Sequence, residues 1–150
     1  MYIFTSALSL LPFLALVGNT YADACTGNPS DTLDCTILTY TDTTTKISNA
    51  PTPGQCDDTC SHIFGDAGDW IVDFRGQPDG YIDHPIGNPC QLRIGRGQGE
   101  PKDYYFFMTN QDMANIIGEV EKRFGGLHNG KVAAQGTMEC GGHKAVWYVD

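Results

Sequence analysis

Six cysteines are the residues whose type and spacing carry the most specific chemistry in this chain of 150 residues. An even number of cysteines in a small exported chain is typical of a disulfide framework, so we expect three disulfides and no free thiol. Cys56 and Cys60 are one helical turn apart with parallel side chains, and we therefore expect them to bond to different partners. The six are Cys25, Cys35, Cys56, Cys60, Cys90 and Cys140.

A zinc site is the alternative use of the same cysteines. Cys56 and Cys60 supply one pair of ligands, but a zinc site needs a second pair at similar spacing. Neither Cys90 nor Cys140 has a second ligand arranged like Cys56 and Cys60, although Cys140 and His143 are three residues apart and keep zinc as an alternative. Disulfides are therefore favoured over zinc, and we expect neither a metal ligand nor a cofactor.

The histidines and carboxylates show no spacing that is diagnostic of catalysis. A secreted nuclease needs two histidines, or a histidine and a glutamate, that converge with a cation on a phosphate. A glycoside hydrolase needs two facing carboxylates, which spacing alone does not reveal. Neither a Gly-x-Ser-x-Gly elbow nor a His-Glu-x-x-His helix occurs in the sequence, so we expect no catalytic residue. The candidates are His62, His84, His128, His143, Asp69, Asp73, Asp79 and Asp83.

One glycine-rich stretch, residues 95–99, superficially resembles a phosphate-binding loop. It lacks the Lys-Ser/Thr pair of such loops, and Glu100-Pro101 follows it in place of a helix. We therefore interpret the stretch as the flexible tip of a hairpin.

The charge balance opposes two classes of partner. The chain has 18 acidic and 9 basic residues, which give a net charge of −9. Binding to a nucleic-acid backbone requires clustered Lys and Arg, and adhesion to anionic lipid requires the same charge. Arg93 and Arg96 are close in sequence, but two arginines are typical of a solvated strand face. We therefore expect no nucleic-acid partner.

The first 24 residues predict export from the cell. Leu8–Val17 form an apolar core of roughly ten residues, the length found in signal peptides, whereas a membrane-spanning helix needs about 20. This core lacks the amphipathic spacing of a soluble helix. Small residues permit cleavage after Ala22 or after Ala24. We therefore expect residues 1–24 to be a signal peptide and the mature protein to be secreted, without a membrane span.

The mature chain divides into two regions that we expect to form one domain. Residues 25–55 are rich in Thr, Asp, Pro, Ser and Asn, which predicts a polar, loop-rich N-terminal segment with a short strand near Ile37–Tyr40. This segment has too little apolar surface to order itself, so its cysteines would anchor it. Residues 56–150 carry the apolar patterns and are expected to form the core.

The core region predicts a disulfide-stapled α+β fold. Two helices are expected, a short one over 57–64 and a longer one that follows Thr109 and ends at Gly125-Gly126. No βαβ unit repeats, which favours a mainly antiparallel sheet with one or two helices packed on it, an α/β sandwich. The aromatic run 104–108 indicates a central strand, and other strands are expected at 70–74, 90–94, 132–140 and 145–149.

The longer helix shows the clearest pattern. Thr109 and Asp112 have the spacing of a capping box. Apolar residues then recur at helical intervals and predict a face buried against the sheet, formed by Met113, Ile117, Val120 and Phe124. Charged residues, among them the i, i+4 pair Glu119 and Arg123, predict an exposed opposite face. That face carries Glu119, Glu121, Lys122 and Arg123.

Several short motifs follow one another in the C-terminal half. They are a Trp-Ile-Val strand, a cysteine-bearing strand, the helix start Thr109–Ile117, the run Lys131–Cys140 and the closing Val146–Val149. Together they resemble the necrosis-inducing factor domain of fungal secreted effectors, the homologues of an extracellular protein from a tomato leaf-mould fungus. The likeness runs from about Cys35 to Tyr148.

This resemblance implies features of both structure and function. Family members commonly rest on four cysteines, which correspond here to Cys35, Cys60, Cys90 and Cys140. That set leaves Cys25 and Cys56 as an additional pair. The family is similar in pattern to small killer toxins, whose α/β sandwich agrees with the expected fold. The resemblance implies a monomeric secreted effector or toxin that binds an unknown host or microbial protein or cell-surface target, with cell death as one outcome, and it transfers no catalytic residue.

Two other classes of function stay open from the sequence. A secreted enzyme, either a hydrolase or a nuclease, would show an acid and a base that converge in a cleft. A cell-wall or carbohydrate-binding protein would show a planar strip of exposed aromatic rings. The candidates for such a strip are Tyr81, Tyr104 and Tyr148.

Overall fold

The structure is a computed structural model that describes residues 24–28, 30–66 and 68–150. The strands are β1 Cys35–Ile37, β2 Thr41–Asp42, β3 Trp70–Asp73, β4 Ile82–Ile86, β5 Leu92–Arg96, β6 Tyr105–Met108, β7 Ala134–Cys140 and β8 His143–Val149. The helices are the short η1 Thr44–Lys46, α1 Pro53–Gly65 and α2 Asn110–Phe124. The predicted signal peptide falls on residues 1–24, of which 1–23 lie outside the described residues.

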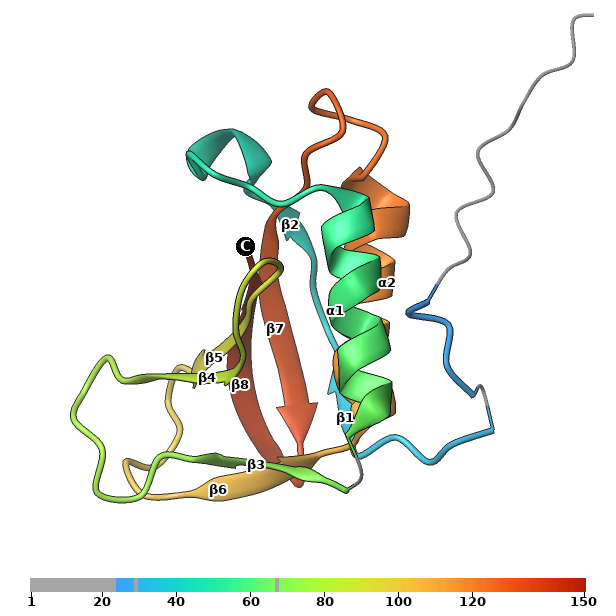
Figure 1. Ribbon diagram of the computed structural model, residues 1–150. Helices are drawn as coiled ribbons and strands as arrows, with labels where there is room; N and C mark the ends of the chain where they lie inside the picture. Colours follow the sequence, from blue (N-terminus) through green and yellow to red (C-terminus); the bar gives the residue numbers. More distant parts are fainter. Residues whose placement is uncertain (1–23, 29, 67) are drawn as a thin grey trace, which may run out of the picture.

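The strands pair antiparallel and form two sheets. The main sheet has the order β1-β7-β8-β5-β4, and β2 also pairs with β7. Strands β3 and β6 form a separate sheet, which lies across the end of the main sheet where β7 finishes (Figure 1). Helices α1 and α2 lie side by side on one flank of the main sheet (Figure 1). With three disulfides, this arrangement confirms the predicted α+β fold class.

Helix α2 begins where the sequence predicts, because the expected capping box forms. Thr109 Oγ1 accepts the Asp112 N–H at 3.1 Å, and Asp112 Oδ2 accepts the Thr109 N–H at 2.8 Å. Phe124 is only half-buried. The other three residues of the predicted buried face are fully buried, and burying such a side chain contributes about 1.5–3 kcal/mol. They are Met113, Ile117 and Val120.

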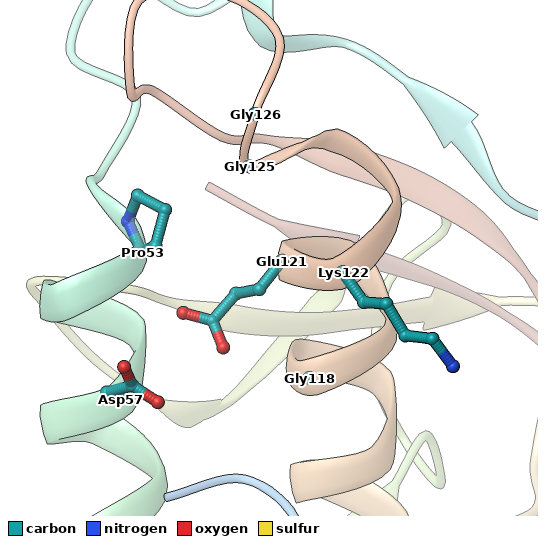
Figure 2. Close-up of a pocket in the computed structure, with 7 residues that line it drawn as sticks. All are labelled: Pro53, Asp57, Gly118, Glu121, Lys122, Gly125 and Gly126. Atoms are coloured by element: carbon teal, nitrogen blue, oxygen red, sulfur yellow. The ribbon is translucent and has the colours of Figure 1, made fainter. Parts of the chain in front are cut away.

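The prediction that Glu121 lies on the exposed face of α2 is wrong. Its neighbours Glu119 and Arg123 do form the expected ion pair, at 2.9 Å. Glu121 instead points toward α1 (Figure 2), because a second face of α2, made of small residues, lets α1 approach closely. At Gly125 of this face, a Cβ atom would lie 3.2 Å from Cγ of Pro53 in α1.

Helix α1 begins earlier than predicted. The Thr52 hydroxyl accepts the Gln55 N–H at 3.3 Å, and the Gln55 side chain accepts the Thr52 N–H at 2.9 Å. Pro53 occupies the first helical position, where its missing N–H costs nothing. The sequence Pro-Thr-Pro-Gly is also typical of turns, so residues 49–54 had the pattern of a loop.

Three strand assignments also differ from the prediction. Strand β6 is not central, since among the described strands it pairs with β3 alone and it alternates between exposed and buried side chains. Strand β4 was not predicted, because Pro85 lies inside it and its register shifts between Asp83 and Ile86. Its edge position tolerates that proline. Residues 95–96, expected at a hairpin tip, belong to β5.

The main sheet packs around Trp147 of β8, which is fully buried. Its cross-strand partner is Gly136 of β7, where a Cβ atom would lie 2.4 Å from the indole ring. Only glycine therefore fits opposite this ring. Tyr40 packs edge-on against Trp147 at 5.2 Å between ring centroids. The other tryptophan, Trp70 of β3, is half-buried and donates its Nε1–H to Asn110 Oδ1 at 2.6 Å.

All six cysteines pair, which confirms the expectation of three disulfides. Cys56 and Cys60 bond to different partners, as their spacing on α1 predicts. The pair Cys25–Cys56 implied by the family resemblance is wrong, because Cys25 bonds to the next turn of α1, at Cys60. The zinc alternative is also excluded, since no cysteine retains a thiolate. The disulfides are Cys25–Cys60, Cys35–Cys140 and Cys56–Cys90.

Candidate functional site

A groove of about 350 Å³ lies between α1 and α2 (Figure 2). Asp57 of α1 and Glu121 of α2 direct their carboxylates into it, whereas Lys122 points away (Figure 2). Three residues of its lining, Gly118 in α2 and Gly125 and Gly126 after its end, have no side chain to fill the groove. Its lining consists of Pro53, Asp57, Gly118, Glu121, Lys122, Gly125 and Gly126.

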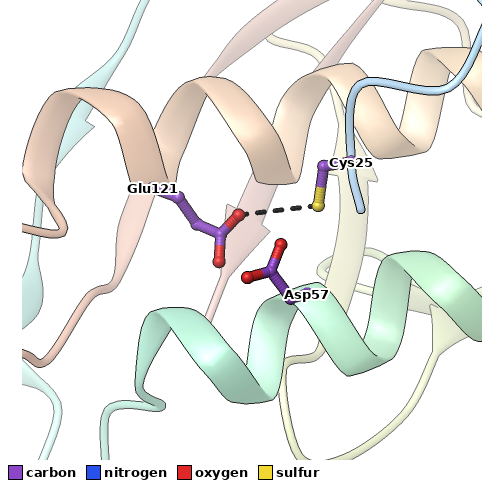
Figure 3. Close-up of side chains that lie close together, drawn as sticks. All are labelled: Cys25, Asp57 and Glu121. Atoms are coloured by element: carbon purple, nitrogen blue, oxygen red, sulfur yellow. Dashed lines mark hydrogen bonds between the residues drawn. The ribbon is translucent and has the colours of Figure 1, made fainter. Parts of the chain in front are cut away.

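The carboxylates of this groove lie beside the N-terminal arm, residues 24–28 (Figure 3). Ligand atoms of Cys25, Asp57 and Glu121 lie within 4.8 Å of one another. Asp57 Oδ1 accepts the Ala24 N–H at 3.1 Å, and Cys25 Sγ lies 3.5 Å from Glu121 Oε2. Cysteine binds metals as a thiolate, and the sulfur of Cys25 is already bonded to Cys60. Asp57 and the Cys25–Cys60 disulfide thus anchor the arm to α1, Gln111 of α2 accepts the Asn28 N–H at 2.9 Å, and the three side chains do not fit a metal site.

The outward face of the β3–β6 sheet is a second surface feature. The antiparallel register places Ile71 opposite Phe107 and Asp73 opposite Tyr105. Since side chains alternate along a strand, these four share one face, and the residues between them point inward. Ile71, Tyr105 and Phe107 are 49, 43 and 47% exposed. These three residues are called the β3–β6 face below.

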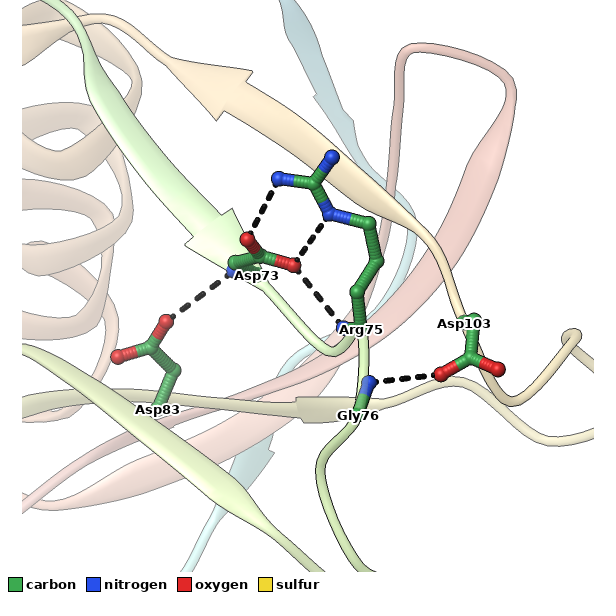
Figure 4. Close-up of polar contacts among 5 residues, drawn as sticks. All are labelled: Asp73, Arg75, Gly76, Asp83 and Asp103. Carbon is green, nitrogen blue, oxygen red and sulfur yellow. Dashed lines mark hydrogen bonds and ion pairs between the residues drawn. The ribbon is translucent and has the colours of Figure 1, made fainter.

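An ion pair fixes one end of the β3–β6 face (Figure 4). The Arg75 guanidinium lies 4.2 Å from the centroid of the Tyr105 ring. Its Nε and Nη2 donate to the two oxygens of Asp73 at 2.9 and 2.7 Å. These side-chain hydrogen bonds from Arg75, with one from its backbone N–H, lower the pKa of Asp73 to about 2. The Tyr105 and Phe107 rings pack edge to face, with 5.8 Å between their centroids. Arg75 therefore orders the Tyr105 ring, and the Tyr105 ring in turn contacts Phe107.

The carboxylates considered for glycoside hydrolysis contact the protein's own groups. Asp83 Oδ2 accepts the Asp73 N–H at 3.4 Å (Figure 4). Asp79 lies 3.7 Å from Arg96 and 3.6 Å from Lys102. A further carboxylate, Asp103, accepts the Gly76 N–H at 2.7 Å and holds the turn after β3 (Figure 4). Asp69 is exposed just before β3.

The four histidines lie on different parts of the fold. His62 in α1 and His84 in β4 are exposed. His128 Nε2 lies 2.6 Å from Asp42 Oδ2, and His143 Nδ1 lies 2.9 Å from a carboxylate oxygen of Glu100. The described residues therefore contain two histidine–carboxylate contacts, each of which joins two segments of the chain.

Tyr81, Tyr104 and Tyr148, the candidates for the aromatic strip of a carbohydrate-binding protein, do not form one exposed strip. Tyr104 is 4% exposed and donates its hydroxyl to the Lys144 carbonyl at 3.0 Å. The exposed rings are those of the next odd-numbered residues, Tyr105 and Phe107. The sequence did not show which rings are exposed. Successive residues of a strand point to opposite faces, and residues 104–107 are aromatic on both faces. The exposed face follows only from the pairing of the run with Trp70–Asp73, which the structure shows.

Within the described residues, neither helix has the length and apolar composition to cross a bilayer.

Comparison with known proteins identifies a family. No curated protein matches the chain. The model of the family Hce2, described as "Pathogen effector; putative necrosis-inducing factor", matches residues 34–140. The match covers more than two thirds of the chain and extends from β1 through β7, so it includes both helices and the β3–β6 face. The resemblance found in the sequence is thereby confirmed: the chain belongs to the Hce2 family of pathogen effectors.

Proposed function

We propose that this protein is a secreted effector that acts by binding a target protein through the β3–β6 face. The observation that carries the proposal is the exposure of Ile71, Tyr105 and Phe107 in register on one small sheet. Contiguous exposed apolar side chains mark interaction sites, and aromatic residues supply much of the binding energy at such sites. The effector family and the disulfide-rich fold fit secretion, with residues 1–24 as the signal peptide.

The ordering of the β3–β6 face supports a role in binding. Arg75 holds the Tyr105 ring through a cation–π contact, and Asp73 holds Arg75 through two hydrogen bonds. A side chain that is already ordered loses less entropy when a partner binds. The other large exposed apolar side chains of the described residues belong to separate segments of the chain and form no such cluster: Leu33, Leu38 and Leu127.

The charge of the protein restricts the choice of target. A net charge of −9 attracts basic surfaces and repels acidic ones over a range of about 8–10 Å at physiological salt. The target is therefore basic or neutral, and association with a basic target slows as salt is added.

Substitution on the β3–β6 face tests the proposal. Phe107→Ser removes an outward ring whose loss leaves the core intact, so we expect the variant to fold and to lose about tenfold or more in activity. Ile71→Ser should behave alike. The matched control is Leu127→Ser, which removes an equally exposed apolar side chain outside the face and should stay within about twofold. Activity is measured as cell death in infiltrated leaves, and as growth inhibition of fungal and bacterial cells, over a dilution series.

The same assay distinguishes binding from catalysis. We expect single replacement of His62, His84 or His128 by alanine to leave activity within a few-fold of the parent, since binding through the β3–β6 face uses none of the three. Loss of a general acid or base typically costs about 10²–10⁴ in rate. A histidine variant that keeps its circular dichroism spectrum but loses activity to that extent would favour a secreted hydrolase or nuclease. The series omits His143, which lines a groove together with Tyr105 and Phe107.

A further inference from the structure

The backbone of β6 has one edge that β3 does not use. Phe74 N–H donates to the Tyr104 carbonyl at 2.9 Å, and these residues continue the β3–β6 register. In an antiparallel pair, hydrogen-bonded and non-hydrogen-bonded residue pairs alternate. Tyr105 and Phe107 therefore direct their N–H and C=O groups away from β3. In agreement, the Phe107 carbonyl oxygen lies 3.9 Å from Cys35 Sγ, on the side opposite β3.

The two edges of this small sheet differ in access. The β3 edge is covered at Asp73, whose N–H donates to Asp83 of β4. Along the β6 edge, no backbone group of the described residues pairs with the N–H of Tyr105 or Phe107. This edge opens on a groove of about 510 Å³, called the β6 groove below. The β6 groove is lined by Asp34, Tyr105, Phe106, Phe107, Gly141 and His143.

The lining of the β6 groove combines aromatic rings with one free acidic side chain. Asp34 is exposed, and its backbone N–H is held by Asp112 Oδ2 at 3.2 Å, so the residue has a fixed position. His143 already contacts Glu100. Neither lysine nor arginine lines the groove. The groove thus offers unpaired backbone groups, two rings and a negative charge to whatever enters it.

We infer that the β6 groove binds an extended segment of the target protein, which adds a strand to β6 and places a lysine or arginine near Asp34. Exposed strand edges pair with extended peptides through main-chain hydrogen bonds, and alternate side chains then give specificity. This inference rests on the proposed function, because it names what the β3–β6 face binds. A neutral glycan would stack on the rings but would gain nothing from the charge of Asp34 or from the regular spacing of the edge.

Peptides selected on the protein provide the test. A displayed library of short linear peptides of random sequence is selected on the mature protein and counter-selected on the Phe107→Ser variant. We expect enrichment of a basic residue flanked by β-branched or aromatic residues. In amide hydrogen exchange, a bound peptide should slow exchange at Tyr105 and Phe107 by about tenfold or more, because both N–H groups become paired. Phe106, which belongs to the β3 ladder, should change little.

Two chemical changes separate main-chain pairing from side-chain contact. In an added strand, every second N–H of the peptide faces β6. N-methylation at these positions should weaken binding by about tenfold or more, and N-methylation at the intervening positions should weaken it much less. Asp34→Asn should weaken binding of a basic peptide by about three- to tenfold. The control Asp58→Asn, on the exposed surface of α1 and outside the groove, should change it by less than about twofold.

The outcomes distinguish this inference from the proposed function. Strand addition is wrong if selection yields no peptide that depends on Phe107, or if a bound peptide leaves exchange at Tyr105 and Phe107 unchanged. In that case the proposed function still holds if Phe107→Ser has lost activity. If chitohexaose or laminarihexaose competes with the target for binding, the occupant of the β6 groove is a glycan and not a peptide. If a peptide pairs with β6 but Ile71→Ser and Phe107→Ser keep full activity, the strand-addition site exists and its link to activity is wrong.

Discussion

Glu100 joins the turn after β5 to the start of β8. Its carboxylate accepts the Lys144 N–H at 3.0 Å and contacts His143 at 2.9 Å. Hydrogen bonds from the Lys144 backbone and then from the His143 side chain lower the pKa of Glu100 below its usual value. His143 also stacks on Tyr104 at 4.5 Å, so one carboxylate orders the end of the sheet that faces the β6 groove.

This lowered pKa has a consequence for stability at low pH. A carboxyl group whose pKa is lower in the folded state stabilises the fold above its unfolded pKa, and this contribution is lost as the pH falls through the folded value. We therefore expect Glu100→Gln to be less stable than the parent at neutral pH and to lose less stability on acidification. Urea unfolding from neutral pH to about pH 3 measures this difference. Equal pH dependence of the two proteins would contradict it, and Asp58→Asn serves as the exposed control.

At the residue scale, the sequence indicated what kind of contact a residue makes better than it indicated which residue is the partner in that contact. It predicted that Cys56 and Cys60 would bond to different residues, but helical spacing does not say which cysteine reaches which turn. It placed Glu121 on the exposed face of α2, because periodicity reports the face with large apolar residues. The second buried face of α2 consists of small residues, which leave no hydrophobic signal in a sequence.

At the scale of elements, the two helices have capping boxes of unequal importance. Asp112 is only 2% exposed, and it accepts the N–H of Asp34 and of Cys35 at 3.2 and 3.1 Å in addition to that of Thr109. The carboxylate therefore joins the start of α2 to β1. The box of α1, formed by Thr52 and Gln55, lies at the surface and serves its own helix.

This difference predicts unequal losses of stability. Asp112→Ala leaves three backbone N–H groups without their acceptor in a buried place, and we expect the free energy of unfolding to fall by about 2–4 kcal/mol. Thr52→Ala removes an exposed cap and should cost about 1 kcal/mol. Urea denaturation of both variants measures the two values. Equal losses would show that Asp112 acts as a helix cap alone.

The sequence predicted the elements whose apolar residues recur at a regular helical or strand spacing. Helix α2 and strands β7 and β8 follow from apolar spacing and from the glycine turn at 141–142. Strand β4 was missed because Pro85 interrupts it, and the first turn of α1 was missed because Pro53-Gly54 also suits a turn. The location of β6 depends on which strand pairs with it, a long-range property that no local pattern contains.

At the scale of the whole molecule, the disulfides connect parts that are distant in sequence. Cys35–Cys140 joins β1 to β7 across 105 residues. Cys25–Cys60 and Cys56–Cys90 span 35 and 34 residues, and both are attached to α1. Helix α1 is thereby tied to the N-terminal arm and to the segment that leads into β5.

These connections predict an order of stability among disulfide variants. In the chain-entropy model, a loop of about 100 residues contributes about 4.7 kcal/mol and one of about 35 residues about 3.8 kcal/mol. We expect the Cys35→Ala/Cys140→Ala protein to be the least stable of the three paired variants in urea. Full reduction should abolish both the fold and the activity, because a domain of this size is stable by only about 5–15 kcal/mol.

The thiol count of the parent protein is the control for this series. Alkylation without reductant should add no mass, since all six cysteines are paired. Two or more alkylated cysteines in the folded protein would contradict the disulfide framework.

The contrasting surroundings of the two tryptophans make the protein its own fluorescent reporter. Trp147 is enclosed between Gly136 and Tyr40, so dissolved quenchers reach its indole only when the main sheet opens. Trp70 is half-buried on the side of β3 opposite Ile71, and its indole donates to Asn110 at the start of α2. Replacing Trp70 by Phe isolates the signal of the main sheet, and replacing Trp147 by Phe isolates the signal of the junction between β3 and α2. A single denaturation can then show whether these two parts of the fold open together.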